Sequence, residues 1–226
     1  MIEIVRGIDL KDALVLDIGR GTGGPAIVLA QDMGARLVCI DVEPPLIERA
    51  RRLARETGVD DQIDFQLVEP GPLPFEAGTF DVVFSKDSMI HIPDKKAIYQ
   101  EIFRVLKPGG VFAASDWLSG HDAAEDAVFQ KYIELAHLSF AMATADETTQ
   151  IMRDAGFVNV MARDRNAWYA DVSAQDVVDI EGPLREQIIE VSDVDTYEHW
   201  LVVRRQLAEA TRSGGLRPTH LRGFRH

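Results

Sequence analysis

The segment VLDIGRGTGG, residues 15–24, constrains the fold more than any other part of this chain. Its apolar start is typical of a buried strand, and its glycines lack a Cβ, so a ligand can approach the main chain where the strand turns into a helix. Gly19, Gly21 and Gly24 have the G-x-G-x-x-G spacing of a dinucleotide-binding turn. Gly23 in place of Gly24 gives an equally good G-x-G-x-G pattern. Glycine-rich turns also arise from packing alone, so the motif needs support from its surroundings.

Apolar runs alternate with helical patterns through the first half of the chain. The patterns predict strands at 13–19, 36–42, 62–69, 80–85 and 111–117, and helices at 25–33, 43–58 and 94–107. This alternation predicts an α/β fold with a doubly wound, mostly parallel sheet.

The second half is largely helical. Helical patterns cover 123–155 and 174–211, and strands at 157–165 and 219–225 bring the sheet to seven strands. We expect a single domain over residues 1–226, with the stretch at about 120–155 forming a helical cap over the carboxyl ends of the strands and a further helical segment at about 174–211.

Two acidic residues narrow the choice of ligand. Asp17 lies inside the first strand, and Asp41 ends the second, where it can accept hydrogen bonds from ribose hydroxyls. An acid below the glycine loop suits a ligand with a positive charge there, such as an α-amino group. S-adenosylmethionine has an amino group and a ribose, and it has no phosphate. An NAD-dependent oxidoreductase remains an alternative that the glycines permit.

The glycine segment, Asp41 and the motif VLKPGG at 105–110 resemble the class I S-adenosylmethionine-dependent methyltransferases, over nearly the whole chain. The resemblance implies S-adenosyl-L-methionine as cofactor, S-adenosyl-L-homocysteine as product, and the Rossmann-like methyltransferase fold. It also implies a set of cofactor-binding residues: Asp17 for the methionine amino end, Gly19 and Gly21 along the cofactor, Asp41 for the ribose, Glu69 for the adenine amino group, and Ser85.

Glu69 has a second interpretation, and Arg20 in the glycine loop departs from the family. Glu69 is alternatively a solvated acid at a strand end. Arg20 stands where the family has a small residue, so the contacts of the loop with the cofactor differ in detail.

The stretch FSKDSMIHIPDK, residues 84–95, mixes apolar and polar residues after the fourth strand. It lies at the switch point where open α/β sheets bind ligands. SKDSMIHIPDK resembles the motif S-R-D-x-x-L-H-I-x-D-K of phosphoethanolamine N-methyltransferases, and is similar to that of sarcosine/dimethylglycine N-methyltransferases. Both families methylate small amines.

Methylation of an amine gives His91 and Asp87 a chemical purpose. An alkylamine is mostly protonated at neutral pH, so transfer to its nitrogen benefits from a group that takes the proton and from close positioning. His91 is the predicted proton acceptor because histidine titrates near physiological pH, and Asp87 is predicted to orient the amine. The alternatives are that Asp87 caps a short helix and that His91 is a core histidine. We expect no metal, because two residues do not complete a coordination shell.

Trp117, Tyr132 and Arg204 are the predicted substrate-binding residues. The two aromatic rings suit a methylated ammonium, and the guanidinium suits a phosphate. A solvated helix face is the alternative for Arg204. Ala136 replaces an arginine that the phosphobase enzymes carry. Their tyrosine-bearing lid helix also has no room before the first strand, so that lid is absent or precedes the sequence given.

Charge and composition exclude several partners. A net charge of −13 repels phosphate backbones, so we expect no nucleic acid. No apolar run approaches the roughly 20 residues needed to span a bilayer, and the lone cysteine Cys39 cannot form an internal disulfide. We expect a cytoplasmic monomer or homodimer.

The sequence predicts an N-methyltransferase acting on a small amine, with phosphoethanolamine or its mono- and dimethyl derivatives as the leading acceptor. Glycine, sarcosine or dimethylglycine is the alternative acceptor. The alternatives of another class are the NAD-dependent oxidoreductase and a catalytically inert cofactor-binding module.

Overall fold

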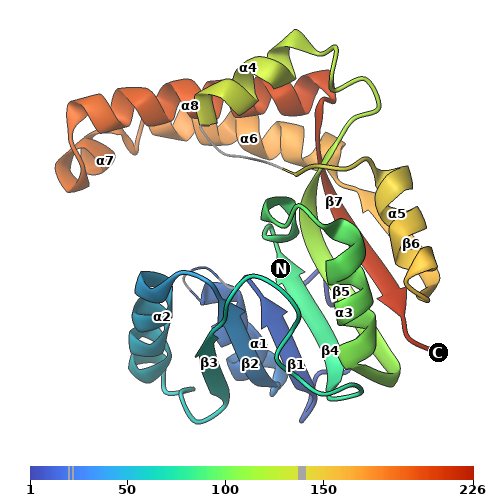
Figure 1. Cartoon of the computed structure of the whole chain (residues 1–226). Coiled ribbons are helices and arrows are strands. Elements are labelled where there is room, and N and C mark those ends of the chain that lie inside the picture. Colours follow the sequence, from blue (N-terminus) through green and yellow to red (C-terminus); the bar gives the residue numbers. More distant parts are fainter. Residues whose placement is uncertain (20, 22, 137–140) are drawn as a thin grey trace. The chain divides into compact units, whose positions relative to one another are not determined.

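The computed structural model describes residues 1–19, 21, 23–136 and 141–226 (Figure 1). Its first half contains β1 (Leu14–Ile18), α1 (Gly24–Met33), β2 (Arg36–Asp41), α2 (Pro44–Thr57), β3 (Ile63–Leu67), β4 (Phe80–Lys86), the 3-10 turn η1 (Met89–His91), α3 (Lys95–Val105) and β5 (Leu106–Ser119). Its second half contains α4 (Ala127–Ala136), α5 (Ala145–Asp154), β6 (Val158–Asp164), α6 (Asn166–Glu181), α7 (Arg185–Val191), α8 (Val194–Ser213) and β7 (Leu216–Phe224).

The seven strands form one sheet in the order β3-β2-β1-β4-β5-β7-β6. The pairs β2–β3, β1–β2, β1–β4 and β4–β5 are parallel. β7 runs antiparallel to β5: Gly109, early in β5, donates its N–H to the carbonyl of Arg225 (2.8 Å), whereas Gly120, after β5, donates to Gly215 (2.9 Å). The predicted mostly parallel, seven-stranded sheet is confirmed, and its strand order reverses between β1 and β4.

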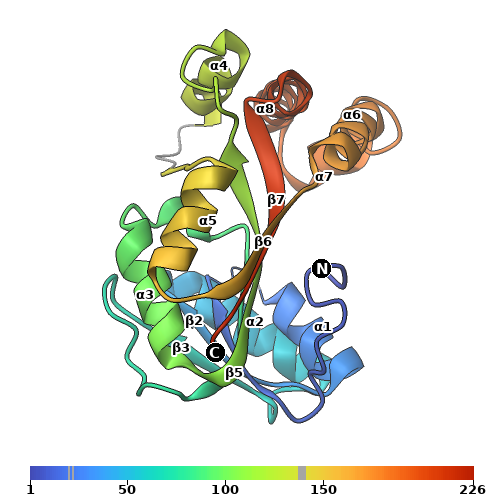
Figure 2. The same cartoon turned by 90° about the vertical axis from the view of Figure 1, so that its right-hand side faces the viewer.

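Side chains that alternate along the strands build a core on each face of the sheet. One face packs on α1 and α2 through a cluster that includes Val15, Leu37, Cys39, Phe65 and Phe84. On the other face, Tyr99 of α3 meets Phe112 of β5 edge to face, with ring centroids 5.7 Å apart. Figure 2 shows α3 and α5 on one side of the sheet and α1 on the other. Because both faces are covered, the inner strands β1 and β2 consist mostly of consecutive apolar residues.

The chain divides into two compact units, which are described separately. Residues 1–116, 146–163 and 220–226 form the first, and residues 117–145 and 164–219 form the second. In the second unit α8 packs between α4 and α6 (Figure 2), over an apolar cluster of Ala123, Phe129, Leu207, Ala210 and Leu216. The expectation of a single domain over residues 1–226 stays a prediction.

The boundary between α3 and β5 differs from the prediction. The helix ends at Val105 and the strand already begins at Leu106, so the segment LKPGG belongs to the strand. Phe80 pairs with Leu106, but Val82 pairs with Val111, so β5 advances five residues where β4 advances two. Pro108 has no N–H to donate to a ladder, and a bulge therefore accommodates the segment.

The helical cap is also less continuous than expected. Helix α4 begins at Ala127 because Asp126 accepts the N–H groups of Val128 and Phe129 at 2.9 and 3.1 Å, which is the arrangement of a helix N-cap. Helix α5 belongs to the first unit. Of the expected cap at 120–155, residues 137–140 lie outside the described part. Among the helices described, none has the length and apolar character needed to cross a membrane.

Candidate functional site

Gly19 joins the end of β1 to the glycine loop in a conformation that favours glycine. Its φ is +68°, and its N–H donates to the carbonyl of Ile40 in β2 (3.0 Å). A Cβ at this position would lie 2.3 Å from the Cβ of Ser88, and the Ser88 hydroxyl donates to the Gly19 carbonyl. The glycine loop and the segment that precedes η1 are therefore in direct contact.

Gly21 and Asp41 meet at the carboxyl edge of the sheet. The N–H of Gly21 donates to Asp41 Oδ2 (3.1 Å), and the N–H of Glu43 donates to Asp41 Oδ1 (3.0 Å). Gly21 has a φ of +54°, and the space around an added Cβ is open. A carboxylate fixed by two main-chain donors beside an open glycine suits a ligand with hydroxyl groups. Arg20 lies outside the described residues.

Asp17 and Ser85 lie beneath this edge. Asp17 is only 1% exposed and stands between Cys39 of β2 and Phe84 of β4 in the sheet register. Ser85 is fully buried, and its hydroxyl donates to the carbonyl of Ile18 (3.0 Å). Ser85 thus supports the strand end that leads into Gly19, and its contact with a cofactor stays a prediction.

Glu69 follows β3 at an exposed position. Two apolar residues at the ends of β2 and β3 are also exposed, and the sequence analysis did not single them out. Val42 and Leu67 are 48% and 52% exposed, and Leu67 is the register partner of Asp41. Exposed apolar side chains at the ends of two neighbouring strands offer a surface for a flat aromatic group. Val42 directly follows β2 and Leu67 ends β3. The predicted ends of these strands could therefore have identified both residues from the sequence.

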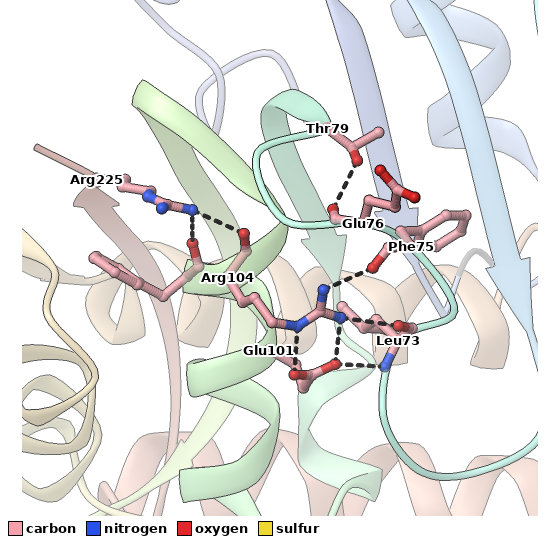
Figure 3. Close-up of polar contacts among 8 residues, drawn as sticks. Leu73, Phe75, Glu76, Thr79, Glu101, Arg104 and Arg225 are labelled. Atoms are coloured by element: carbon pink, nitrogen blue, oxygen red, sulfur yellow. Dashed lines mark hydrogen bonds and ion pairs between the residues drawn. The ribbon is translucent and has the colours of Figure 1, made fainter.

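The loop that follows Glu69 is tied to α3 by one charged pair (Figure 3). Arg104 binds Glu101 at 2.7 Å and donates to the carbonyls of Leu73 (2.9 Å) and Phe75 (2.7 Å), while Glu101 accepts the N–H of Leu73 (2.8 Å). The hydrogen bond from Arg104 lowers the pKa of Glu101. The pair fixes three main-chain groups of the loop, including both polar groups of Leu73.

Asp87 adopts a left-handed conformation with φ +58°. Its N–H donates to the carbonyl of Ser115 (2.7 Å), the Ser115 hydroxyl donates to Oδ1 (3.0 Å), and Lys86 pairs with Oδ2. Ser88, not Asp87, precedes η1, and it makes no side-chain cap. The carboxylate keeps lone pairs for a further donor, and its role in orienting an amine stays a prediction.

His91 ends η1 at an exposed position. Partial burial lowers the pKa of its imidazole, and the positive charge of Lys95 lowers it further. The ring is therefore neutral at physiological pH and able to accept a proton. A fully enclosed core histidine, the alternative from the sequence, does not match this exposure.

Asp116 and Lys95 are charged neighbours of this turn. The sequence analysis included Lys95 only as the last residue of its motif and gave Asp116 no role. Asp116, in β5, is 2% exposed, and its Oδ1 accepts the N–H of Ile90 (3.1 Å). Lys95, the first residue of α3, donates to the carbonyl of Met89. A carboxylate inside the apolar run VFAASDW is the signal that could have found Asp116, as it did for Asp17.

The predicted substrate-binding residues all lie in the second unit. Trp117 packs edge to face on Tyr169, with centroids 4.9 Å apart, and Tyr132 lines the same apolar cluster. Burial raises the pKa of the Tyr132 hydroxyl, and the charge of Arg204 partly offsets this. Tyr132 on α4 and exposed Arg204 on α8 therefore interact within this unit.

Residues 15–110 match the family model of the methyltransferase domain. This part of the chain is a methyltransferase domain. The match covers the glycine loop, the carboxyl edges of β1–β4 and the turn that bears His91, so the resemblance stated from the sequence is confirmed.

Curated relatives of the methyltransferase domain act on different acceptors. A sarcosine/dimethylglycine N-methyltransferase of Halorhodospira halochloris is 35% identical over 153 residues, which are 68% of this chain and 54% of that protein. Phosphoethanolamine N-methyltransferase 1 of Arabidopsis thaliana is 29% identical over 85% of this chain and 38% of that protein. A sterol 24-C-methyltransferase, ERG6A of Gibberella zeae, is 38% identical over 57% of this chain and 34% of that protein. The chain thus spans about a third to a half of the relatives it matches.

A solved structure extends the likeness of fold beyond the methyltransferase domain. Phosphoethanolamine N-methyltransferase 2 of Haemonchus contortus, in complex with phosphomonomethylethanolamine and S-adenosylhomocysteine, superposes with a TM-score of 0.90 at 20% identity, over 99% of this chain and 52% of that one. The fold is therefore shared over the helical unit as well.

Proposed function

We propose that this chain transfers a methyl group from S-adenosyl-L-methionine to the nitrogen of a small amine. The contact between Gly19 and Ser88 carries this proposal, because it joins the glycine loop to the segment that bears Asp87 and His91. A donor held by the loop and an acceptor held by this segment meet at the switch point of the sheet.

The residues at the carboxyl edge fit the proposed cofactor. Open space at Gly21 lets a ligand approach the main chain, Asp41 offers carboxylate oxygens to ribose hydroxyls, and exposed Val42 and Leu67 offer an apolar surface to adenine, with Glu69 nearby. Buried Asp17 places a carboxyl group beneath the loop that would hold the amino group. The cofactor carries its methyl group on a positively charged sulfur. The nitrogen of the amine uses its lone pair to accept that methyl group.

His91 and Asp87 would prepare the amine. The lowered pKa of His91 keeps its imidazole neutral, so it takes the proton of an ammonium and frees the lone pair. Asp87, held by Ser115 and Lys86, directs a carboxylate oxygen toward the ammonium N–H. His91 thus acts through its proton affinity, and Asp87 acts by orienting the ammonium group.

Transfer of labelled methyl groups tests the reaction class. The protein is incubated with labelled S-adenosyl-L-methionine and, in turn, ethanolamine, phosphoethanolamine, glycine, sarcosine and dimethylglycine. We expect label on at least one amine, and no label on any of them overturns the proposal. Thermal-shift titration with S-adenosyl-L-homocysteine and with NAD runs in parallel, and stabilisation by NAD alone would favour the oxidoreductase.

Phosphoethanolamine or its methylated derivatives are our first choice of acceptor. Burial raises the pKa of the Tyr132 hydroxyl, and the positive charge of Arg204 in the same helical unit lowers it in part. A guanidinium and a phenol hydroxyl are groups that bind phosphate. Arg204→Gln should raise the KM for phosphoethanolamine about tenfold or more and leave kcat similar. Arg205→Gln is the matched control, because Arg205 already pairs with Glu181 at 2.6 Å. Equal effects of the two variants would favour the glycine-type acceptors.

The expected monomeric or dimeric state and cytoplasmic location stay predictions. Sedimentation of the purified chain tests the first, and fractionation of the source cell tests the second.

A further inference from the structure

We propose that Lys95 and Asp116 are positioning residues for His91, and that they act by holding the peptide group that precedes it. This inference rests on the proposed function, in which His91 accepts the amine proton. Lys95 closes the stretch 84–95 as the first residue of α3, and Asp116 lies outside that stretch, in β5.

The two charged groups bind opposite ends of a single peptide unit. Asp116 Oδ1 accepts the N–H of Ile90 at 3.1 Å, and the Lys95 ammonium donates to the carbonyl of Met89. These two polar groups flank the same C–N bond, so the pair fixes the plane of that peptide. The next residue in the chain is His91.

A three-residue turn needs such support. A single 3-10 turn has few internal hydrogen bonds and poorer hydrogen-bond geometry than an α-helix. Met89 and Ile90 are buried and anchor the turn by packing, whereas His91 is exposed. Charge-assisted hydrogen bonds are about twice as strong as neutral ones, and here they come from two different elements, α3 and β5.

The charges around the turn also act on the imidazole. Burial lowers the pKa of Lys95, and Asp116 partly restores it; the Lys95 ammonium in turn helps to lower the pKa of His91. Other charged residues close to the turn in the sequence are Lys86 and Asp87 at the end of β4, which pair with each other, Asp94, which caps α3 by accepting the N–H of Ala97 (2.9 Å), and the exposed Lys96. Lys95 therefore has two separable effects, one on the geometry of the turn and one on the proton affinity of His91.

Titration of the histidine resonances by NMR separates these effects without any amine present. His91→Gln assigns the signal of His91. In Lys95→Gln, which keeps a donor and loses the charge, we expect the midpoint of His91 to move up toward the ordinary value of 6.5. Lys96→Gln, at the exposed neighbour, removes a charge of the same kind and should leave the midpoint in place. If the titration midpoint of His91 is the same in Lys95→Gln as in Lys96→Gln, the proposed effect of the Lys95 charge on His91 is overturned.

Steady-state kinetics test the positioning half. Lys95→Met removes the ammonium from the Met89 carbonyl, which still accepts the N–H of Ile92 (3.0 Å), and Asp116→Ala removes the acceptor of the Ile90 N–H. In each variant kcat should fall about tenfold or more, with the KM for S-adenosyl-L-methionine unchanged. Lys95→Gln and Asp116→Asn keep a donor and an acceptor, so they should retain most of kcat. Wild-type kcat in Lys95→Met, the variant at the partly exposed position, overturns the positioning half even when Asp116→Ala does not fold. If the NMR midpoint moves as expected and no amine is methylated, the proposed function fails and the control of His91 by Lys95 stands.

Discussion

Gly19 and Ser88 touch across the carboxyl ends of β1 and β4. The Ser88 hydroxyl donates to the Gly19 carbonyl, and a Cβ at residue 19 would lie 2.3 Å from the Cβ of Ser88 and 2.6 Å from its Oγ. Real Cβ atoms do not approach other carbons so closely, so this contact requires glycine. It also joins the proposed donor and acceptor sides of the site.

Gly19→Ala should lower the free energy of unfolding by about 2–4 kcal/mol, because it combines a left-handed φ with a steric clash. Gly21→Ala is the matched control: its φ is also positive, but an added Cβ meets open space, so we expect a loss of only about 1 kcal/mol. Urea unfolding measures both. Adding Ser88→Gly to Gly19→Ala removes the clashing Cβ and should recover part of the loss; no recovery would show that the contact is not the cause.

Asp41→Ala should weaken the binding of S-adenosyl-L-homocysteine by about tenfold or more. The substitution removes the acceptor of the Gly21 N–H and the oxygens proposed for the ribose. Calorimetric titration measures the affinity. Asp64→Asn, at an exposed position on β3, should bind as the wild type does, and a comparable loss there would point to a general effect of charge.

Methyl transfer should depend on pH through His91. Protonated imidazole cannot accept a proton, so kcat should fall as the pH drops through the pKa of His91, which lies below 6.5. At pH values above this pKa, kcat should no longer change with the protonation of His91. In His91→Gln the acidic limb should disappear and kcat should fall about 10²-fold. An unchanged acidic limb in that variant would assign the titration to another group.

The pair Glu101–Arg104 should hold the loop that follows Glu69 (Figure 3). Glu101→Gln weakens the pair, so we expect faster hydrogen exchange at the N–H of Leu73 and a loss of about 1–3 kcal/mol in the free energy of unfolding. The pKa of Glu101 is lower in the folded chain than its ordinary 4.5, so its contribution is present above pH 4.5 and is lost as the pH falls through the folded value. Glu76→Gln, at an exposed loop position, is the control, and equal exchange in both variants would contradict the role of the pair.

Much of the fold could be predicted from the sequence because its signals are local. The glycine loop, the alternation of apolar runs with helical patterns and the carboxylates at strand ends gave the sheet and the positions of Asp17 and Asp41. The prediction was wrong where a local signal has two meanings. The sequence predicts a helix over 94–107, but the helix ends at Val105, and Pro108 and the two glycines after it lie inside β5 because a bulge accommodates them.

The sequence by itself determined the class of fold, the glycine turn and the residue types at the carboxyl edge, because periodicity and the missing Cβ act over a few residues. Only the tertiary structure decided which of these groups meet. Ser88 reaches Gly19 across 69 positions of the chain, and Asp116 reaches Ile90 across 26. Such contacts depend on strand order and register, which bring distant main-chain donors and acceptors to the same sheet edge, and no local pattern encodes them.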